Sequence, residues 1–422
     1  MMSPSLRRLP LFRAAIFEHH HGPLMGLPKW FAVCGAAAFL AVAPASSQAA
    51  QDAPGTLPRD AQANQSLRQE IEHSITRGCD WLRLQQNASG AFSEERTPAL
   101  TALALTALLR AGTEAAPTQL AGLEKGFAFI RSHAKPDGGI YAESLSNYNT
   151  ALSLLALLQK SEPGDAALIS GARNFLVNQQ AHHMVRPELD GGVGYGPTGV
   201  SPKRAHPDLD NTLVSLEALR AFELAYKAQE QSQPDSTQHP FDWKAAAAFV
   251  SRCQNLATSN PQPWVADSKS DRGGFVYYPG FSNAGEVQQE NGRKALRSSG
   301  SMSYAGLLSF IYAEIPENDP RTAAAQAWLH DNFTLEENPG LGKQGLFYYY
   351  HLMAKALAAS GTKTLETKGA THDWARELGI ELINRQESGG FWVNDTGRWM
   401  EKNEVLVTSY CLLTLELLRN RL

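Results

Sequence analysis

The sequence is poor in cysteine and in long apolar runs. Only 4 of its 422 residues are cysteine, and Cys34 lies in an apolar segment near the N-terminus. Cys79, Cys253 and Cys411 each fall inside a helical pattern, and an odd number cannot be fully paired, so buried free thiols are favoured over a disulfide framework. Beyond the N-terminal segment no apolar run approaches about 20 residues, which predicts a soluble globular chain without a membrane span.

The chain also lacks an excess of positive charge and several familiar catalytic motifs. Its 38 basic and 42 acidic residues give a net charge of −4, so nucleic acid is not an expected partner. There is no Gly-rich phosphate loop, no Ser/His/Asp nucleophile motif and no thioester motif. There is no Asp-x-Cys pair either, and Cys411 has no acid or histidine at ligand spacing. No zinc or other metal and no cofactor is therefore predicted.

The N-terminal region has the pattern of an export signal. From Met25, "MGLPKWFAVCGAAAFLAVAPASSQAAQ" places a basic residue before an apolar core and small residues before a cut after Ala49. The sequence predicts a signal peptide over 1–49, with a possible true start at Met25, and a disordered linker over 50–63. Cleavage would leave 34 basic and 41 acidic residues. The protein is expected to be periplasmic or secreted.

A repeat runs through the remainder. Residues 77–92, "RGCDWLRLQQNASGAF", and 378–392, "LGIELINRQESGGFW", share the same spacing of small, apolar, glutamine, glycine and aromatic positions. Copies with insertions or substitutions give six units. The residues expected to have structural roles in the repeat are Gln86, Gly90, Gln180, Gln254, Gln386, Gly390 and Trp392.

In each unit, the glycine position of the repeat is followed by a second segment that is almost wholly apolar. Aligning the centres of these segments matches Thr101, Thr150, Thr212, Ser303, Tyr350 and Thr408. The first helix of each unit instead has an apolar stripe and a charged face. Apolar helices must lie inside and amphipathic helices outside, so residues 64–422 are predicted to form one all-α domain, an (α/α)6 toroid with two concentric rings.

This spacing resembles the QW motif of the terpenoid cyclases, and the whole pattern resembles the prenyltransferase and squalene oxidase repeat family. The resemblance extends from about Ser66 to Leu418 and implies an α/α toroid, a fold that serves lipid cyclases, protein prenyltransferases and non-catalytic modules alike. In triterpene and class II diterpene cyclases the acid motif is Asp-x-Asp-Asp followed by Thr. Here Asp208, Asp210 and Thr212 match it, Asn211 replaces the last aspartate, and the resemblance makes Asp210 the proton donor.

The same residues have a structural interpretation. Asp and Asn are favoured N-caps, and a negative charge at a helix N-terminus is stabilised by the helix dipole, together by about 1 kcal/mol. Asn149 precedes Thr150 as Asn211 precedes Thr212, as a repeated cap would. Capping is favoured over catalysis on these grounds.

Long insertions at 181–207, 255–301 and 391–406 all fall between the outer and the inner helix of a unit, so they emerge on one rim. Rim loops are a usual place for binding. The candidate rim residues, together with two on the fifth inner helix, are Arg204, His206, Asn211, Trp264, Tyr277, Tyr278, Phe281, Arg297, Tyr350, His351, Trp392 and Trp399. Of these, His206 is also a candidate to orient Asp208.

Three functions stay open. The favoured one is an exported repeat protein that binds a small apolar ligand or a protein partner at its rim. The alternative is a class II terpenoid cyclase, similar to squalene-hopene cyclases, with Asp210 as general acid. The third is a carbohydrate-active (α/α)6 enzyme, for which Asp208 or Asp210 with Glu404 would be the paired carboxylates.

Overall fold

The computed structural model describes residues 59–112, 117–196, 206–228, 240–289, 292–367 and 369–422. Over these ranges the chain forms paired α-helices. The first helices of the pairs are α2 (Arg59–Leu84), α4 (Pro117–Ser132), α6 (Ala166–Asn178), α8 (Trp243–Arg252), α10 (Pro320–Asp331) and α12 (Trp374–Asn384). The second helices are α3 (Pro98–Ala111), α5 (Ser146–Lys160), α7 (Leu209–Ala228), α9 (Gly300–Tyr312), α11 (Leu346–Ala359) and α13 (Glu404–Arg419).

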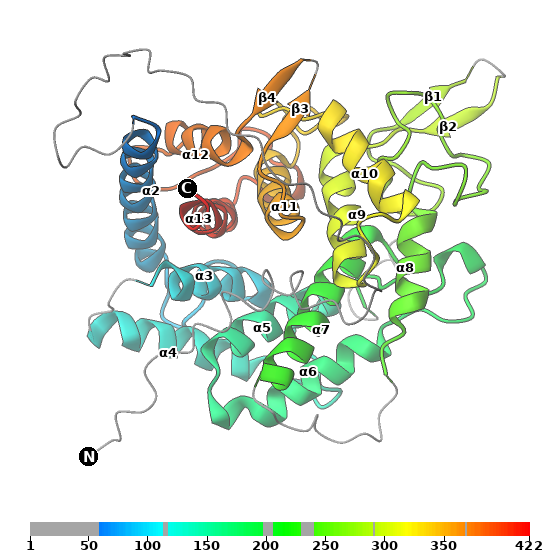
Figure 1. The fold of residues 1–422 in the computed structure, drawn as a ribbon. Helices are drawn as coiled ribbons and strands as arrows, with labels where there is room; N and C mark the ends of the chain where they lie inside the picture. The colour runs from blue at the N-terminus through cyan, green and yellow to red at the C-terminus, as the bar shows by residue number, and fades with distance from the viewer. Residues whose placement is uncertain (1–58, 113–116, 197–205, 229–239, 290–291, 368) are drawn as a thin grey trace, which may run out of the picture.

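The second helices close into an inner ring. Each packs against the next in the order α3, α5, α7, α9, α11, α13, and α13 packs against α3. The first helices lie outside this ring, as Figure 1 shows for α2, α4, α6, α8, α10 and α12. Helix α2 contacts both α12 and α13, so the first unit joins the last. This closed double ring confirms the predicted (α/α)6 toroid.

Burial divides the two rings as the hydrophobic pattern predicts. Along α9 only Ile311 keeps more than slight exposure, because the helix is enclosed by α7, α11, α8 and α10. In α12 the buried residues fall on one stripe, formed by Trp374, Leu378 and Leu382 with their neighbours. An apolar helix is stable where every side is covered, and an amphipathic helix where one side meets water.

The residues aligned at the centres of the inner helices have a common contact. In five of the six units the hydroxyl accepts the backbone N–H of the residue two positions after the repeat glycine in the preceding loop. The pairs are Thr101 with Phe92 (3.2 Å), Thr150 with Ile140 (2.9 Å), Thr212 with Val193 (2.9 Å), Ser303 with Phe275 (3.0 Å) and Thr408 with Trp392 (3.0 Å). The fifth unit has Tyr350 at this position, and its hydroxyl donates to the carbonyl of Leu335 instead.

The repeat glutamines join four of the six units to the next one. The Gln180 amide donates to the carbonyls of Gly191 (3.0 Å) in its own loop and Asp242 (2.8 Å) before the next outer helix. Gln86 and Gln254 make the matching pairs of bonds. Gln386 donates to Gly390 (2.8 Å) and to Ser74 (3.0 Å) of α2. The last bond closes the toroid between its sixth and first units.

The repeat glycines allow the next outer helix to approach. Gly191 has φ +86°, and a Cβ there would overlap the backbone carbonyl of Ala245 in α8. Gly390, with φ +96°, is placed in the same way against the carbonyl of Arg77 in α2. A side chain at these positions would both strain the backbone and separate neighbouring units.

Two antiparallel hairpins extend from the toroid, β1 (Glu286–Gln288) with β2 (Lys294–Leu296), and β3 (Leu365–Thr367) with β4 (Ala370–His372). The expected signal peptide over 1–49 and the candidate Arg204 lie outside the described residues. Helix α2 begins at Arg59, within the segment expected to be a linker. None of the described helices combines the length and the apolar character that crossing a bilayer requires.

The glycine contact generates a stability prediction. Gly191→Ala should lower the free energy of unfolding by about 2–4 kcal/mol, because it adds a steric overlap to a strained φ. Gly285→Ala is the matched control, since Gly285 has φ +83° but no described atom within 4 Å of an added Cβ. It should cost only about 1 kcal/mol. Thermal unfolding by circular dichroism compares them, and equal losses would contradict the role given to the contact between units.

Candidate functional site

Three large polar side chains occupy one repeat position on the inner helices. Tyr148, Asp210 and Tyr348 each stand two residues before the aligned central residue of their helix. Tyr148 is in α5, Asp210 in α7 and Tyr348 in α11. The other units have Ala99, Ser301 and Leu406 there. All three polar side chains keep partial exposure although their helices are packed on both flanks, which places that exposure toward the axis of the ring.

Asp208 is the N-cap of α7. Its Oδ1 accepts the backbone N–H of Asn211 at 2.8 Å, and its two carboxylate oxygens accept the Asn211 amide at 3.1 and 2.9 Å. The side chain is fully buried. Burial raises the pKa of Asp208 from 3.8 to about 8, with a further rise from nearby Asp210, against the lowering effect of the bonds from Asn211.

Asp210 has a different role from Asp208. Its Oδ1 accepts the hydroxyl of Tyr348 at 2.6 Å. Helices α7 and α11 are not neighbours in the ring, since each packs against α9, so this bond reaches across the ring interior. Burial raises the pKa of Asp210 from 3.8 to about 6, while the bond from Tyr348 lowers it. The carboxyl is thus enclosed by protein, partly exposed and poised between its two protonation states near neutral pH.

A second contact crosses the ring on the other side. The Tyr148 and Tyr410 hydroxyls are 3.2 Å apart, although α5 and α13 are separated by α3. The Tyr410 ring lies 5.5 Å from that of Tyr348 and is stacked on His351 at 5.2 Å. We call Tyr148, Asp210, Tyr348 and Tyr410 the axial collar. It surrounds the axis with aromatic rings and one carboxyl.

Glu401 supports the collar from the 391–406 insertion. Its side chain is buried, and its Oε1 accepts the backbone N–H of Tyr348 at 2.8 Å, at the N-terminus of α11. Its Oε2 accepts the Asn394 amide at 2.5 Å. Burial raises the pKa of Glu401 from 4.5 to about 7. Sequence reasoning selected Glu404 in this insertion, but Glu404 is exposed at the first position of α13.

No spacing signal distinguishes Glu401. A cap supplied from a loop of the neighbouring unit leaves no local motif around α11, whose own N-cap is Gly345. Glu401 follows an exposed 3-10 turn, Arg398–Met400, in which Trp399 and Met400 both have positive φ.

An ion pair lies deeper in the ring. Lys355 Nζ of α11 is 2.5 Å from Glu217 Oε2 of α7, and the side chains are only 13% and 12% exposed. The two residues stand seven positions after Tyr348 and Asp210 on the same helices. Sequence reasoning selected neither, because single charges within apolar segments gave no sign of being paired with each other.

The structure separates the remaining sequence candidates. Trp392 is not a rim residue: it is fully buried, and its indole N–H donates to the carbonyl of Leu382 at 2.8 Å. Tyr350 is also buried, in the packing between α11 and the loop at Leu335. His351 lies behind Tyr410, with its Nδ1 3.3 Å from the Thr414 hydroxyl; burial holds its pKa well below the usual value.

The loop residues lie nearer the surface. The His206 ring packs against Tyr278 in a tilted arrangement, with ring centroids 4.0 Å apart, and its Nδ1 lies 3.2 Å from the carbonyl of Pro207. The Tyr277 hydroxyl is 2.8 Å from that of Tyr195 and contributes to lowering the pKa of Asp208. The other candidates differ in exposure: Trp264 is partly buried, whereas Phe281, Arg297 and Trp399 are exposed.

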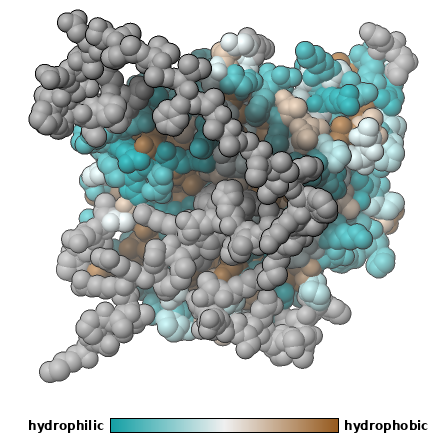
Figure 2. Space-filling model, viewed as in Figure 1, coloured by the Kyte–Doolittle hydropathy of each residue, from teal (hydrophilic) through white to brown (hydrophobic). Residues whose placement is uncertain are grey.

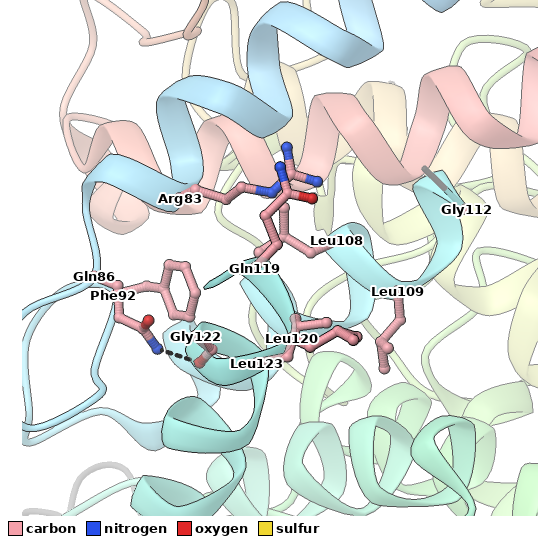
Figure 3. A pocket seen from close by; sticks show the side chains of 10 residues that line it. All are labelled: Arg83, Gln86, Phe92, Leu108, Leu109, Gly112, Gln119, Leu120, Gly122 and Leu123. Carbon is pink, nitrogen blue, oxygen red and sulfur yellow. Dashed lines mark hydrogen bonds between the residues drawn. The ribbon is translucent and has the colours of Figure 1, made fainter. Parts of the chain in front are cut away.

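A surface pocket of about 450 Å³ lies away from the collar, where α2, α3 and α4 meet. Figure 3 shows leucines lining it, with the Gln86 amide directed at the carbonyl of Gly122. This bond belongs to the repeat contact, and the pocket contains no carboxylate or nucleophile. The described side chains visible in Figure 2 are mainly hydrophilic with scattered apolar residues. Among the described residues no group of three His, Cys, Asp or Glu could hold a metal ion.

Comparison with known proteins finds solved structures of similar fold but no matching protein family. No protein-family model and no curated protein sequence matches the chain. Type II terpene cyclase MstE from Scytonema aligns in two forms. The complex with geranylgeranyl dihydroxybenzoate has a TM-score of 0.49 at 10% identity, covering 85% of this chain and 100% of that chain. An apo variant of the same cyclase has a TM-score of 0.48 at 11% identity, covering 85% of this chain and 99% of that chain. A glycosidase has a TM-score of 0.41 at 13% identity, covering 86% of this chain and 99% of that chain. The fold assignment rests on the closed ring itself.

The three carboxyls with raised pKa values, Asp208, Asp210 and Glu401, generate a pH prediction. Raised pKa values in the folded state mean that the native protein binds protons more tightly than the unfolded chain. The stability that these three groups contribute should therefore be greatest below pH 4 to 5. The contribution of each is lost as the pH rises through its folded-state pKa, which is about 6 for Asp210, about 7 for Glu401 and about 8 for Asp208.

Denaturant unfolding of Asp208→Asn and Glu401→Gln should show a flatter loss of stability between pH 5 and 8 than the wild type, while exposed Glu404→Gln keeps the wild-type slope. Asn is itself a favoured N-cap, so the first variant keeps the helix start. If both variants lose stability with pH as steeply as the wild type, Asp208 and Glu401 do not cause the pH dependence.

Proposed function

We propose that the toroid binds a largely apolar, unsaturated ligand on its axis, and that Asp210 protonates it. The observation that supports this most is that two neighbouring aspartates make different contacts. Asp208 caps α7. Asp210 takes no part in the cap, keeps part of its surface accessible, and in the described contacts its side chain accepts a hydrogen bond only from the Tyr348 hydroxyl. An acid with a raised pKa and accessible surface that makes no capping contact is a candidate for chemistry.

The chemistry fits a general acid acting on an alkene. Burial favours the neutral form of Asp210, so a proton is available without a charged group having to be kept in an apolar site. Transfer of that proton to a carbon–carbon double bond would form a carbocation, which further double bonds could attack. Loss of a proton from the final cation leaves an isomer of the ligand. Catalysis of this kind is the terpenoid cyclase alternative.

The aromatic residues of the collar suit such an intermediate. Tyr148, Tyr348 and Tyr410 gather around Asp210, and the face of an aromatic ring attracts a cation by about 0.5–2 kcal/mol. Asn211 departs from the cyclase motif, yet its amide engages both oxygens of Asp208. We infer that an amide there anchors Asp208 without placing a third carboxylate beside Asp210.

The carbohydrate alternative has less support. A glycosidase needs two carboxyls facing one substrate, about 5–10 Å apart. In the described part of the chain, Asp208 is engaged by Asn211 and Glu401 by the N-terminus of α11, while Glu404 is exposed. None of these leaves an evident partner for Asp210.

Incubation with squalene or shorter linear polyenes, analysed by gas chromatography and mass spectrometry, tests the acid. Asp210→Asn should lose at least about 100-fold in product formation, the lower end of the effect of a general acid, while still binding the polyene. Product formation should fall as pH rises through about 6. Equal conversion by wild type and Asp210→Asn would contradict the proposal, as would absence of both binding and product.

Tyr348→Phe provides a second arm of this test. Because the Tyr348 hydroxyl lowers the pKa of Asp210, its removal should shift the decline in activity to higher pH. Tyr349→Phe is the matched control, since the Tyr349 hydroxyl donates to the carbonyl of Thr334 at 2.9 Å, away from the collar. It should leave the pH profile in place.

We also propose export, on the charge and apolar pattern of residues 1–49. Expression of the full chain in a bacterium should yield periplasmic protein beginning at Ala50, as measured by N-terminal sequencing. Protein that stays in the cytoplasm with its N-terminal segment intact would contradict export and leave the proposal for Asp210 unaffected.

A further inference from the structure

Two cross-ring contacts join the same pair of helices at two levels. Asp210 of α7 meets Tyr348 of α11, and seven residues further along each helix Glu217 meets Lys355. Seven residues of α-helix rise about 10 Å. The polar groups therefore form two levels along the axis, one at the collar and one about two helical turns deeper.

The deeper pair is an exception within the repeat. The equivalent positions of the other four inner helices are Thr106, Leu155, Leu308 and Leu413. Apolar side chains are thus compatible with packing at this level. An enclosed ion pair gives little net stability, because the cost of removing two charges from water offsets their attraction. Folding alone does not account for Glu217 and Lys355.

The level between the two contacts is apolar except for Tyr410 of the collar. Two residues after the aligned central residues stand Leu103, Leu152, Val214, Ala305, Leu352 and Tyr410. Leu103, Leu152 and Val214 keep 5%, 8% and 6% of their surface accessible, so apolar side chains present accessible surface at this level. A ligand that reached from Asp210 to the ion pair would pass through mainly apolar surroundings and end at two opposite charges.

We propose that Glu217 and Lys355 bind the polar end of the ligand, and that the ligand is a linear unsaturated alcohol. This inference rests on the proposed function. A hydroxyl can accept from the Lys355 ammonium and donate to the Glu217 carboxylate at once. A hydrocarbon end would remove water from the pair and replace none of its hydrogen bonds. The reacting double bond would lie about 10 Å from the hydroxyl, at the level of Asp210.

Displacement of the fluorescent probe anilinonaphthalene sulfonate from the full-length mature protein tests this preference. The competitors are geraniol, the hydrocarbon myrcene and the longer alcohol farnesol. Wild type should bind geraniol about tenfold more tightly than myrcene, the effect of one hydrogen bond to a charged group. It should also bind geraniol more tightly than farnesol, which is longer than the spacing of the two levels.

The variants remove or exchange the whole pair, because a single substitution would leave an unpaired buried charge and endanger folding. The double variant Glu217→Met with Lys355→Met should lose the preference for the alcohol and bind farnesol at least as well as geraniol. The exchanged pair, Glu217→Lys with Lys355→Glu, should keep the preference. Circular dichroism establishes that each variant is folded.

The outcomes separate the two proposals. Equal geraniol-to-myrcene ratios in wild type and the double Met variant would overturn the role of the ion pair while leaving ligand binding near Asp210 intact. If no competitor displaces the probe from wild type and polyenes also fail to bind, the proposed function itself fails, and this inference with it.

Discussion

The amide hydrogen bonds of the repeat glutamines are the interaction on which the rest of the toroid depends. Each joins the glycine turn of one unit to the outer helix of the next, and the bond from Gln386 to Ser74 joins the two ends of the described ring. Because the turn glycine has no side chain, the neighbouring helix can approach its backbone. At four of the six junctions these contacts hold neighbouring units together, and with them the inner helices whose side chains face the axis.

A scaffold held at its outer turns leaves the axial positions free to differ between units. The position two residues before the central hydroxyl is Ala99 in one unit, Asp210 in another and Tyr348 in a third. The collar and the deeper ion pair both use this freedom on the same two helices, α7 and α11. Burial within the ring raises the pKa of the Asp210 carboxyl, and the cross-ring bond from Tyr348 partly offsets that rise.

The repeat, the two rings and the order of the units could be predicted from the sequence, because glycine, glutamine and hydroxyl positions recur at fixed spacing. Contacts across the axis could not, since the residues that meet are more than 130 positions apart and neither partner has a local signature. Trp392 illustrates the reverse error: an aromatic residue in an insertion suggested a rim, but it fills the core beneath α12. The capping pattern at residues 208–211, "DLDN", predicted the role of Asp208 but not the separate contact of Asp210.

The proposed acid role requires that Asp210, on the ring axis, keeps its proton up to about pH 6, well above the ordinary range of an aspartate. Infrared spectroscopy of the carboxylic acid C=O stretch, taken as the difference between wild type and Asp210→Asn across a pH titration, measures this directly. The account predicts a protonated-carboxyl band that is lost in the variant and titrates in the wild type near pH 6. A difference spectrum showing only ionised carboxylate above pH of about 4, the ordinary range for aspartate, would contradict it.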